Sequence, residues 1–171
     1  ELSALVAESA SLLRTRTEPA EVRIACESDP IAVEADRASL LRVVSNLLDN
    51  ATKWSPRGST VRVEITAEAA GEVLLKVVNR GATIEPDHLP RLFDRFYRGD
   101  PSRSDADRNH GLGLSIVAAI ARMHGGRPLA TSSGGFSTIG MILKDAATEP
   151  GLSGLPEPAA GQEAIAVSPG R

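Results

Sequence analysis

The sequence has little of several residue types, and each shortage excludes a class of protein. It contains a single cysteine, Cys26, so no intrachain disulfide can form, which fits a reducing compartment. No apolar run approaches the ~20 residues that a membrane-spanning helix needs, and no signal peptide opens the chain. The formal net charge is −3, so the basic excess typical of proteins that bind nucleic acid or anionic membranes is missing.

The composition otherwise predicts one ordinary globular domain. The chain has 171 residues, of which 42 % are hydrophobic and 24 % are charged, enough for a proper core. Beyond residue 145 the composition shifts to Ala, Gly, Pro and Glu, so we expect a domain over residues 1–145 and a disordered tail over residues 146–171. Because the first residue is Glu1 rather than Met, we also expect a piece of a longer protein, with any membrane anchor preceding it.

Hydrophobic periodicity predicts helices and strands in mixed order. Helices are expected over residues 1–14, from the N-cap Asp36 to about Trp54, and over residues 112–123 before a left-handed cap at Gly125-Gly126. Strands are expected over residues 22–26, 31–33, 61–65, 73–78, 129–131 and 138–143. Most strand pairs are joined tightly, so we predict an α+β fold, a two-layer α/β sandwich whose mixed, mostly antiparallel sheet has helices on one face.

Polar side chains form a stripe on the predicted helix that ends near Trp54. At about 100° per residue, Asn46, Asn50 and Lys53 fall within roughly 60° of one another, while apolar residues gather on the opposite side. A carboxamide oxygen is a ligand that Mg²⁺ accepts when it already carries substrate phosphates. The stripe therefore indicates a site for a metal and a phosphate, with a solvated polar face as the alternative.

The segment Gly111-Leu112-Gly113 opens the last predicted helix. Free N–H groups and the dipole attract anions at a helix start, and glycines let a polyphosphate come close. The segment lacks the Gly-Lys-Ser/Thr of a phosphate loop, and Ile116 stands where a dinucleotide fingerprint has its third glycine. A flexible hinge is the alternative to a phosphate site.

Two further features concern a base and a lid. Asn79-Arg80-Gly81 ends a predicted strand with an amide that could read the edge of a purine, although a turn is the alternative. Aromatic residues make up only 3 % of the chain, yet Phe93, Phe96 and Tyr97 lie within five residues of one another. They predict an anchor, packed on the core, for a mobile lid over residues 99–110.

The order of these segments resembles a known family. Over about residues 1–144 the chain resembles the ATP-binding domain of bacterial sensor histidine kinases, in the superfamily shared with DNA gyrase and related ATPases. The motifs that carry the resemblance are residues 46–54 (the N box), 92–98 (the F box), 111–117 (the G2 box) and 137–138 in the closing Gly-rich strand. The Asn-x-Gly form and the run over residues 88–93 look most like the heavy-metal sensor kinases.

The resemblance implies roles at the phosphate end of a bound ATP. Asn50 would ligate Mg²⁺, and Asn46 and Lys53 would face the phosphates. Gly111 and Gly113 would line the polyphosphate, with Arg95 or Arg98 approaching from the lid. Trp54 would flank the adenine pocket. The other nucleotide contacts that the resemblance implies are Asn79, Gly81, Ile84, Leu112, Leu114 and Thr138.

The first glycine box departs from the family's pattern. The family usually has an Asp there that accepts a hydrogen bond from the adenine amino group, whereas this chain has Asn79 and lacks the second glycine. An amide oxygen accepts the same bond without the strength of an ionised acceptor, so we expect lower nucleotide affinity. Asn109 also stands where many relatives have glycine.

The resemblance further implies a kinase rather than an ATP hydrolase. In the hydrolysing relatives a Glu one turn before the metal-ligating Asn activates water, but Asn46 stands there and cannot accept a proton. We expect the domain to transfer the γ-phosphoryl group to a histidine on a separate dimerisation domain, for relay to a response regulator. None of the histidines, His88, His110 and His124, has the expected His-Glu/Asp-x-x-x-Pro setting, so the phosphoacceptor is not expected in this chain.

The same resemblance implies a cytoplasmic domain of an inner-membrane sensor protein, with no nucleic-acid partner and no direct membrane contact. Three alternatives stay open. The chain could be a serine kinase of the anti-sigma type, a degenerate module that binds nucleotide or a partner without catalysis, or a soluble α/β domain with chance motifs.

Overall fold

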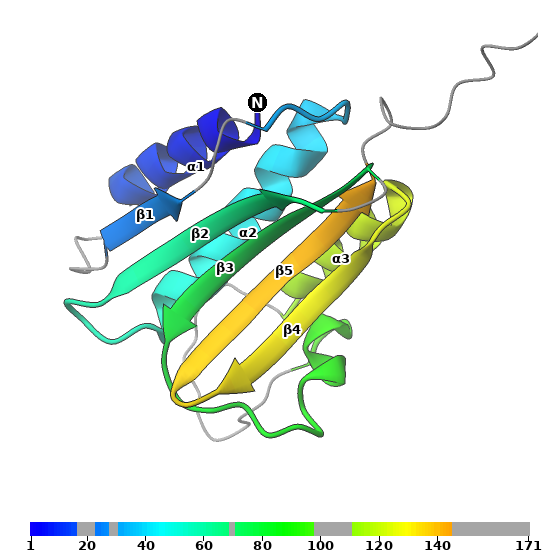
Figure 1. Ribbon diagram of the computed structural model, residues 1–171. Helices are drawn as coiled ribbons and strands as arrows, with labels where there is room; N and C mark the ends of the chain where they lie inside the picture. The colour runs from blue at the N-terminus through cyan, green and yellow to red at the C-terminus, as the bar shows by residue number, and fades with distance from the viewer. Residues whose placement is uncertain (17–22, 28–30, 69–70, 98–110, 145–171) are drawn as a thin grey trace, which may run out of the picture.

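The protein forms a sheet with its helices on one face (Figure 1). The computed structural model describes residues 1–16, 23–27, 31–68, 71–97 and 111–144. The elements are α1 (Leu2–Arg16), β1 (Arg23–Glu27), α2 (Arg37–Trp54), β2 (Thr60–Ala67), β3 (Glu72–Arg80), η2 (Pro90–Phe93), α3 (Gly113–Met123), β4 (Arg127–Ser133) and β5 (Phe136–Lys144). In Figure 1, α1, α2 and α3 all lie behind the sheet, and the short 3₁₀ helix η2 lies beside β4. The predicted lid and tail lie outside the described residues.

The five strands are arranged in the order β1-β2-β3-β5-β4. β1 pairs with β2 in parallel, whereas the β2–β3, β3–β5 and β4–β5 pairs are antiparallel. This confirms the predicted two-layer sandwich with a mixed, mostly antiparallel sheet. β5 lies between β3 and β4. The end of β3 therefore lies beside the start of β5, although the two are distant in the sequence.

The predicted strand over residues 31–33 is wrong. The backbone there is irregular, and the Ile31 carbonyl accepts a hydrogen bond from the Leu2 N–H at the start of α1, with 3.0 Å between nitrogen and oxygen. Ile31 and Val33 still pack against the core. The apolar pattern therefore predicted the burial of these residues correctly. The backbone of Ile31, however, bonds to the start of a helix and not to a strand.

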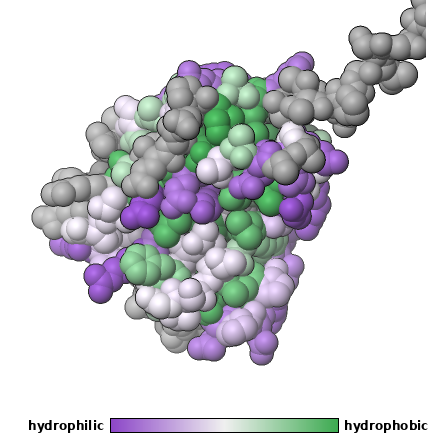
Figure 2. Space-filling model, viewed as in Figure 1, coloured by the Kyte–Doolittle hydropathy of each residue, from purple (hydrophilic) through white to green (hydrophobic). Residues whose placement is uncertain are grey.

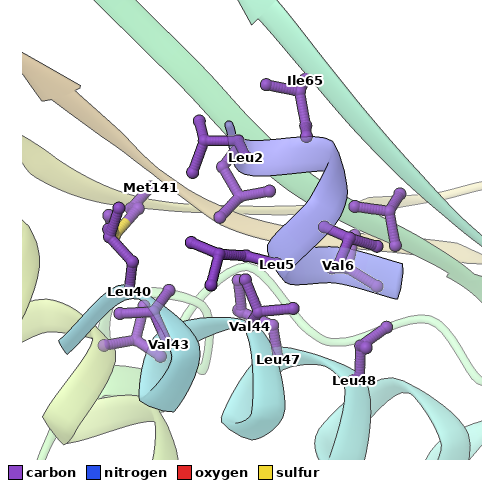
Figure 3. Close-up of a cluster of buried hydrophobic side chains, with 14 of the residues drawn as sticks. Leu2, Leu5, Val6, Leu40, Val43, Val44, Leu47, Leu48, Ile65 and Met141 are labelled. Atoms are coloured by element: carbon purple, nitrogen blue, oxygen red, sulfur yellow. The ribbon is translucent and has the colours of Figure 1, made fainter. Parts of the chain in front are cut away.

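Side chains from α1, α2 and the sheet form one hydrophobic core. Figure 3 shows Leu5 and Val6 of α1 pointing toward Val43 and Val44 of α2, under Ile65 of β2. The inward residues of the strands alternate with outward ones, as expected for a half-buried sheet. This packing fixes α2, and so fixes the direction in which its polar stripe faces.

The ends of the site-bearing helices are set by local residues. Asp36 caps α2 as predicted, because its Oδ2 accepts a hydrogen bond from the Ser39 N–H at 2.8 Å. The hydrogen bonds from Ser39 lower the pKa of the Asp36 carboxyl below its ordinary value. At the far end of α3, Gly125 has a φ of 66°, and the Gly126 N–H donates to the Ala121 carbonyl at 2.8 Å, which closes the left-handed cap predicted there.

The other face of the sheet carries no helix among the described residues. Figure 2 looks onto this face, where green hydrophobic and purple hydrophilic residues are interspersed. Lys76 and Glu64 pair across β3 and β2 there, with 2.7 Å between Nζ and Oε2. None of the helices in the described part of the chain has the length and apolar character needed to cross a membrane.

Candidate functional site

The polar stripe of α2 faces the start of α3. A Cβ built on Gly113 would lie 3.3 Å from Oδ1 of Asn46, so the helix start passes directly over this carboxamide. Nδ2 of Asn46 is buried and has no hydrogen-bond partner among the described residues. A buried donor without a partner is costly and uncommon in a folded protein. The arrangement therefore suits a ligand that brings an acceptor to this position.

The start of α3 supplies a second feature that suits an anionic ligand. α3 has 11 residues, and its N-cap residue, Leu112, makes no side-chain capping hydrogen bond among the described residues. The first N–H groups of a helix lack intrahelical acceptors and carry the positive end of the dipole. Together with the unpartnered Asn46 amide, they gather hydrogen-bond donors at one point, as helix starts that bind phosphate do.

The rest of the stripe continues toward the end of α2. Asn50 is half-buried one turn beyond Asn46, while Lys53 and Trp54 are exposed. Nζ of Lys53 lies 6.0 Å from the centre of the Trp54 ring. A Cβ on Gly81 would lie 3.0 Å from the Trp54 carbonyl oxygen, so the residue after β3 must be small to pack against the end of α2.

Asn79 lies on the buried face of β3, at the end nearest Gly81. Its side chain is 4 % exposed, and its Nδ2 donates a hydrogen bond to the Arg80 carbonyl at 3.2 Å. That donation leaves the carboxamide oxygen as the acceptor. The carboxamide that the sequence predicts as an acceptor for the base therefore lies in a position that is shielded from water.

Ser137, which the sequence prediction missed, is the residue of β5 directly opposite Asn79. It is 5 % exposed and faces the helices, whereas Thr138 pairs with Val78 on the open face of the sheet. The structure thus does not bring Thr138 to the other predicted contacts. Strand alternation would have distinguished the two hydroxyl residues once the register with β3 was known.

A short hydroxyl network extends from Ser137. Its Oγ lies 3.2 Å from Oγ of Ser132, which accepts a hydrogen bond from the Ile84 N–H at 2.9 Å. The Gly81 N–H donates to the Gly135 carbonyl at 2.9 Å. The segment that contains Gly81 and Ile84 is therefore tied to the hairpin between β4 and β5 beside Asn79.

Gly111 holds the end of the F box against the start of α3. Its φ is 68°, and a Cβ there would lie 3.0 Å from Cα of Phe96. The Phe96 N–H donates to the Gly111 carbonyl at 3.1 Å. Of the three aromatics predicted as an anchor, Phe93 packs on the core, but the Phe96 side chain is 69 % exposed, so at that position the tether is the backbone.

The remaining predicted residues fall in three places. Leu114 is half-buried and packs against the core, and Leu112 is 37 % exposed at the turn into α3. Arg95 lines a groove on the flank of α3 opposite to Asn46, so the structure does not bring it to the amide stripe. Arg98 and Asn109 lie outside the described residues.

Comparison with known proteins gives consistent matches for this chain. Residues 35–146 match the family model described as histidine kinase-, DNA gyrase B- and HSP90-like ATPase. The sensor histidine kinase CusS of Escherichia coli K12 is 44 % identical over 105 residues, 61 % of this chain and 22 % of CusS. Sensor protein KdpD of Clostridium acetobutylicum is 36 % identical over 119 residues, 70 % of this chain and 13 % of KdpD. The chain thus spans less than a quarter of the length of these relatives.

Solved structures agree with the sequence matches. The mycobacterial sensor histidine kinase MprB superposes with a TM-score of 0.74 at 29 % identity, covering 84 % of this chain and 95 % of the MprB chain. The catalytic domain of histidine kinase ThkA superposes with a TM-score of 0.72 at 22 % identity, covering 84 % of this chain and 94 % of that chain, which supports the fold alone.

Proposed function

Since this chain belongs to the family of histidine kinase-, DNA gyrase B- and HSP90-like ATPases, we propose that it is the ATP-binding catalytic domain of a sensor histidine kinase. In this proposal it binds Mg-ATP and presents the γ-phosphoryl group to a histidine on a separate dimerisation domain of the same parent protein. The cognate response regulator then receives the phosphoryl group. The likeness to CusS and to the probable sensor kinase SilS supports the narrower resemblance to heavy-metal sensor kinases.

The observation that carries the proposal is the unpartnered amide of Asn46. It lies under Gly113 at the start of α3, where a phosphate oxygen can accept from both the side chain and the helix N–H groups. Lys53 would reach the same polyphosphate from the exposed end of the stripe. Binding at this point would remove the cost of a buried donor that the free protein carries.

The half-buried carboxamide of Asn50 would hold Mg²⁺. Its oxygen would supply one protein ligand, with phosphate oxygens and waters completing the shell that this ion prefers. A bound magnesium ion would neutralise charge on the phosphates as the γ-phosphoryl group is transferred. The position suits that role because Asn50 lies one helical turn from Asn46.

The base would lie at the opposite end of the site, against Asn79. The carboxamide oxygen of Asn79 would accept a hydrogen bond from the adenine amino group, and Ser137, opposite Asn79 on β5, offers a hydroxyl beside it. The exposed Trp54 ring and the Ile84 side chain would flank the base. Because Asn79 is uncharged, we expect the adenine bond to be weaker than one made by an ionised carboxylate.

The site residues favour phosphoryl transfer over hydrolysis. Asn46 stands where hydrolysing relatives have a Glu, and a carboxamide cannot accept a proton from water. The contribution of the chain would then be to position the nucleotide and stabilise its charge. We propose that the parent protein is an inner-membrane sensor and that this domain lies in the cytoplasm, as the resemblance to sensor histidine kinases implies.

The test is titration of the full chain with a fluorescent ATP analogue in the presence of Mg²⁺. The wild type should bind saturably, and Asn50→Ala should weaken binding at least tenfold while the turn variant Arg57→Ala should not. The chain alone should form no phosphoprotein, but addition of the parent's dimerisation domain should give acid-labile, base-stable phosphate. Acid-stable phosphate would instead favour the serine kinase, and absence of nucleotide binding would contradict the proposal.

A further inference from the structure

A second hollow lies on the flank of α3 that faces away from the proposed nucleotide site. It has a volume of about 580 Å³ and lies between η2, α3 and the strand β4. Ser115, Ala119 and Arg122 line it from α3. At about 100° per residue these positions lie roughly 180–240° around the helix from Gly113, which faces Asn46. The groove is therefore separate from the amide stripe.

Apolar side chains line part of this groove, which runs along a sheet edge. Leu89 and Phe93 line it from the start and end of η2, and Pro128 and Ala130 line it from β4. β4 pairs only with β5, so its outer backbone groups have no strand partner in the described sheet. An unpaired edge beside apolar side chains is the surface to which an extended peptide adds.

The charged groups of the groove are mainly basic. Arg95 and Arg122 approach it from two different segments, and among the described residues Asp94 is the single acid that lines it. Within the described part of the chain, neither guanidinium is in an ion pair. Two guanidinium groups without an ion pair among the described residues, beside apolar side chains, complement a ligand that carries carboxylates next to apolar side chains.

We propose that this groove binds an extended, acidic segment of a partner protein. The segment lies along β4, its carboxylates pair with Arg95 and Arg122, and its apolar side chains cover Phe93 and Ala119. An extended chain of five residues is about 17 Å long, which suits a groove of this volume. This inference does not depend on the proposed nucleotide binding, because its residues lie on the other flank of α3.

The test uses the peptide acetyl-Glu-Val-Glu-Val-Glu-amide, labelled with fluorescein, and anisotropy titration with the full chain. Peptides with Gln or Lys in place of Glu serve as controls. We expect saturable binding of the Glu peptide that is about tenfold weaker for the Gln peptide and lost for the Lys peptide, as charge pairing requires. The Glu peptide should shift amide resonances of residues 89–95, 115–122 and 128–130, other than the prolines, in the 17.9 kDa chain.

Two variants locate the site. Arg122→Glu should reduce affinity for the Glu peptide at least tenfold, and Ala119→Trp should block it by filling the groove. Arg57→Glu has the same charge change in the turn after α2 and should leave binding unchanged. All three should keep the wild-type nucleotide titration, and Asn50→Ala should keep peptide binding, so failure of one site is distinguished from failure of the other.

Several results would overturn the inference. Equal affinity for the Glu, Gln and Lys peptides would exclude charge pairing. Resonance shifts confined to the open face of the sheet would place the ligand elsewhere. Unchanged affinity in both Arg122→Glu and Ala119→Trp, with native spectra for each variant, would exclude the groove.

Discussion

Replacing Asn46 with leucine should separate the stability of the fold from its capacity to bind nucleotide. Nδ2 of Asn46 is buried without a partner among the described residues, and Oδ1 lies against Gly113. A buried polar group left without a hydrogen bond costs about 1–3 kcal/mol, and leucine has nearly the same shape without that group. We therefore expect Asn46→Leu to raise the free energy of unfolding of the ligand-free protein.

The size of the effect follows from the size of the domain. A gain of about 1 kcal/mol raises Tm by about 4 °C in a domain of this length, so a gain of about 1–2 kcal/mol predicts a rise of about 4–8 °C. Nucleotide at about 100 times its Kd would stabilise the wild type by about 2.7 kcal/mol through binding to the folded state. The variant lacks the amide and should show little of this ligand-induced shift. Far-UV circular dichroism during heating, with and without a non-hydrolysable Mg-ATP analogue, measures both quantities.

Ser9 provides the matched control for this experiment. Besides Asn46 Nδ2, Ser9 Oγ is the other buried side-chain nitrogen or oxygen atom without a hydrogen-bond partner in the described residues. Ser9 lies on α1, within the helix layer. Ser9→Ala should also stabilise the free protein but should keep the full shift with nucleotide. The reasoning would be refuted if Asn46→Leu lowered the Tm of the free protein, or if its shift with nucleotide equalled that of the wild type.

Three further predictions concern catalysis, packing and pH. Asn46→Glu should raise ATP hydrolysis measured by phosphate release, because it supplies a general base; unchanged hydrolysis with intact binding would contradict this. Gly126→Ala should lower the urea midpoint more than Gly58→Ala, since the added Cβ would lie 1.8 Å from a β5 carbonyl oxygen at Gly126, whereas at Gly58 it meets nothing within 4 Å and the cost is only the backbone strain of a φ of 76°. The lowered pKa of Asp36, caused by hydrogen bonds from Ser39, means that its stabilising effect is present above its unfolded-state pKa and is lost as pH falls through its folded-state pKa. The difference in Tm between wild type and Asp36→Ala should therefore disappear in acid, and a difference that grew as pH fell would refute it.

Local sequence signals predicted most of the elements because their causes are local. The N-cap at Asp36 and the left-handed Gly125 depend on neighbours within four residues, and both are confirmed. The strand predicted over residues 31–33 failed because an apolar alternation reports burial, and the partner of this backbone is Leu2, far away in the sequence. The parallel pairing of β1 with β2 likewise depends on tertiary packing rather than on either strand alone.

The site shows the same division between local and long-range information. The spacing of Asn46 and Asn50 on one helix follows from helical geometry alone. The choice between Ser137 and Thr138 depends on the register between β3 and β5, which are joined through residues 81–135. A one-residue difference in register reverses the face of a strand, so two adjacent hydroxyl residues could not be distinguished without the pairing.

The glycines of the site act through close contacts more than through turn geometry. Gly81 lies against the last carbonyl of α2, Gly113 lies over Asn46, and Gly111 lies against the backbone of Phe96. Each contact joins two elements that carry predicted ligand residues, and only Gly111 has a positive φ. A β-carbon at Gly113 would make a tight contact with the Asn46 amide, which lacks a partner in the described residues. The backbone conformation of Gly113 itself would accept alanine. The sequence thus keeps glycine where helix propensity alone would favour alanine, and that cost is explained by access to Asn46.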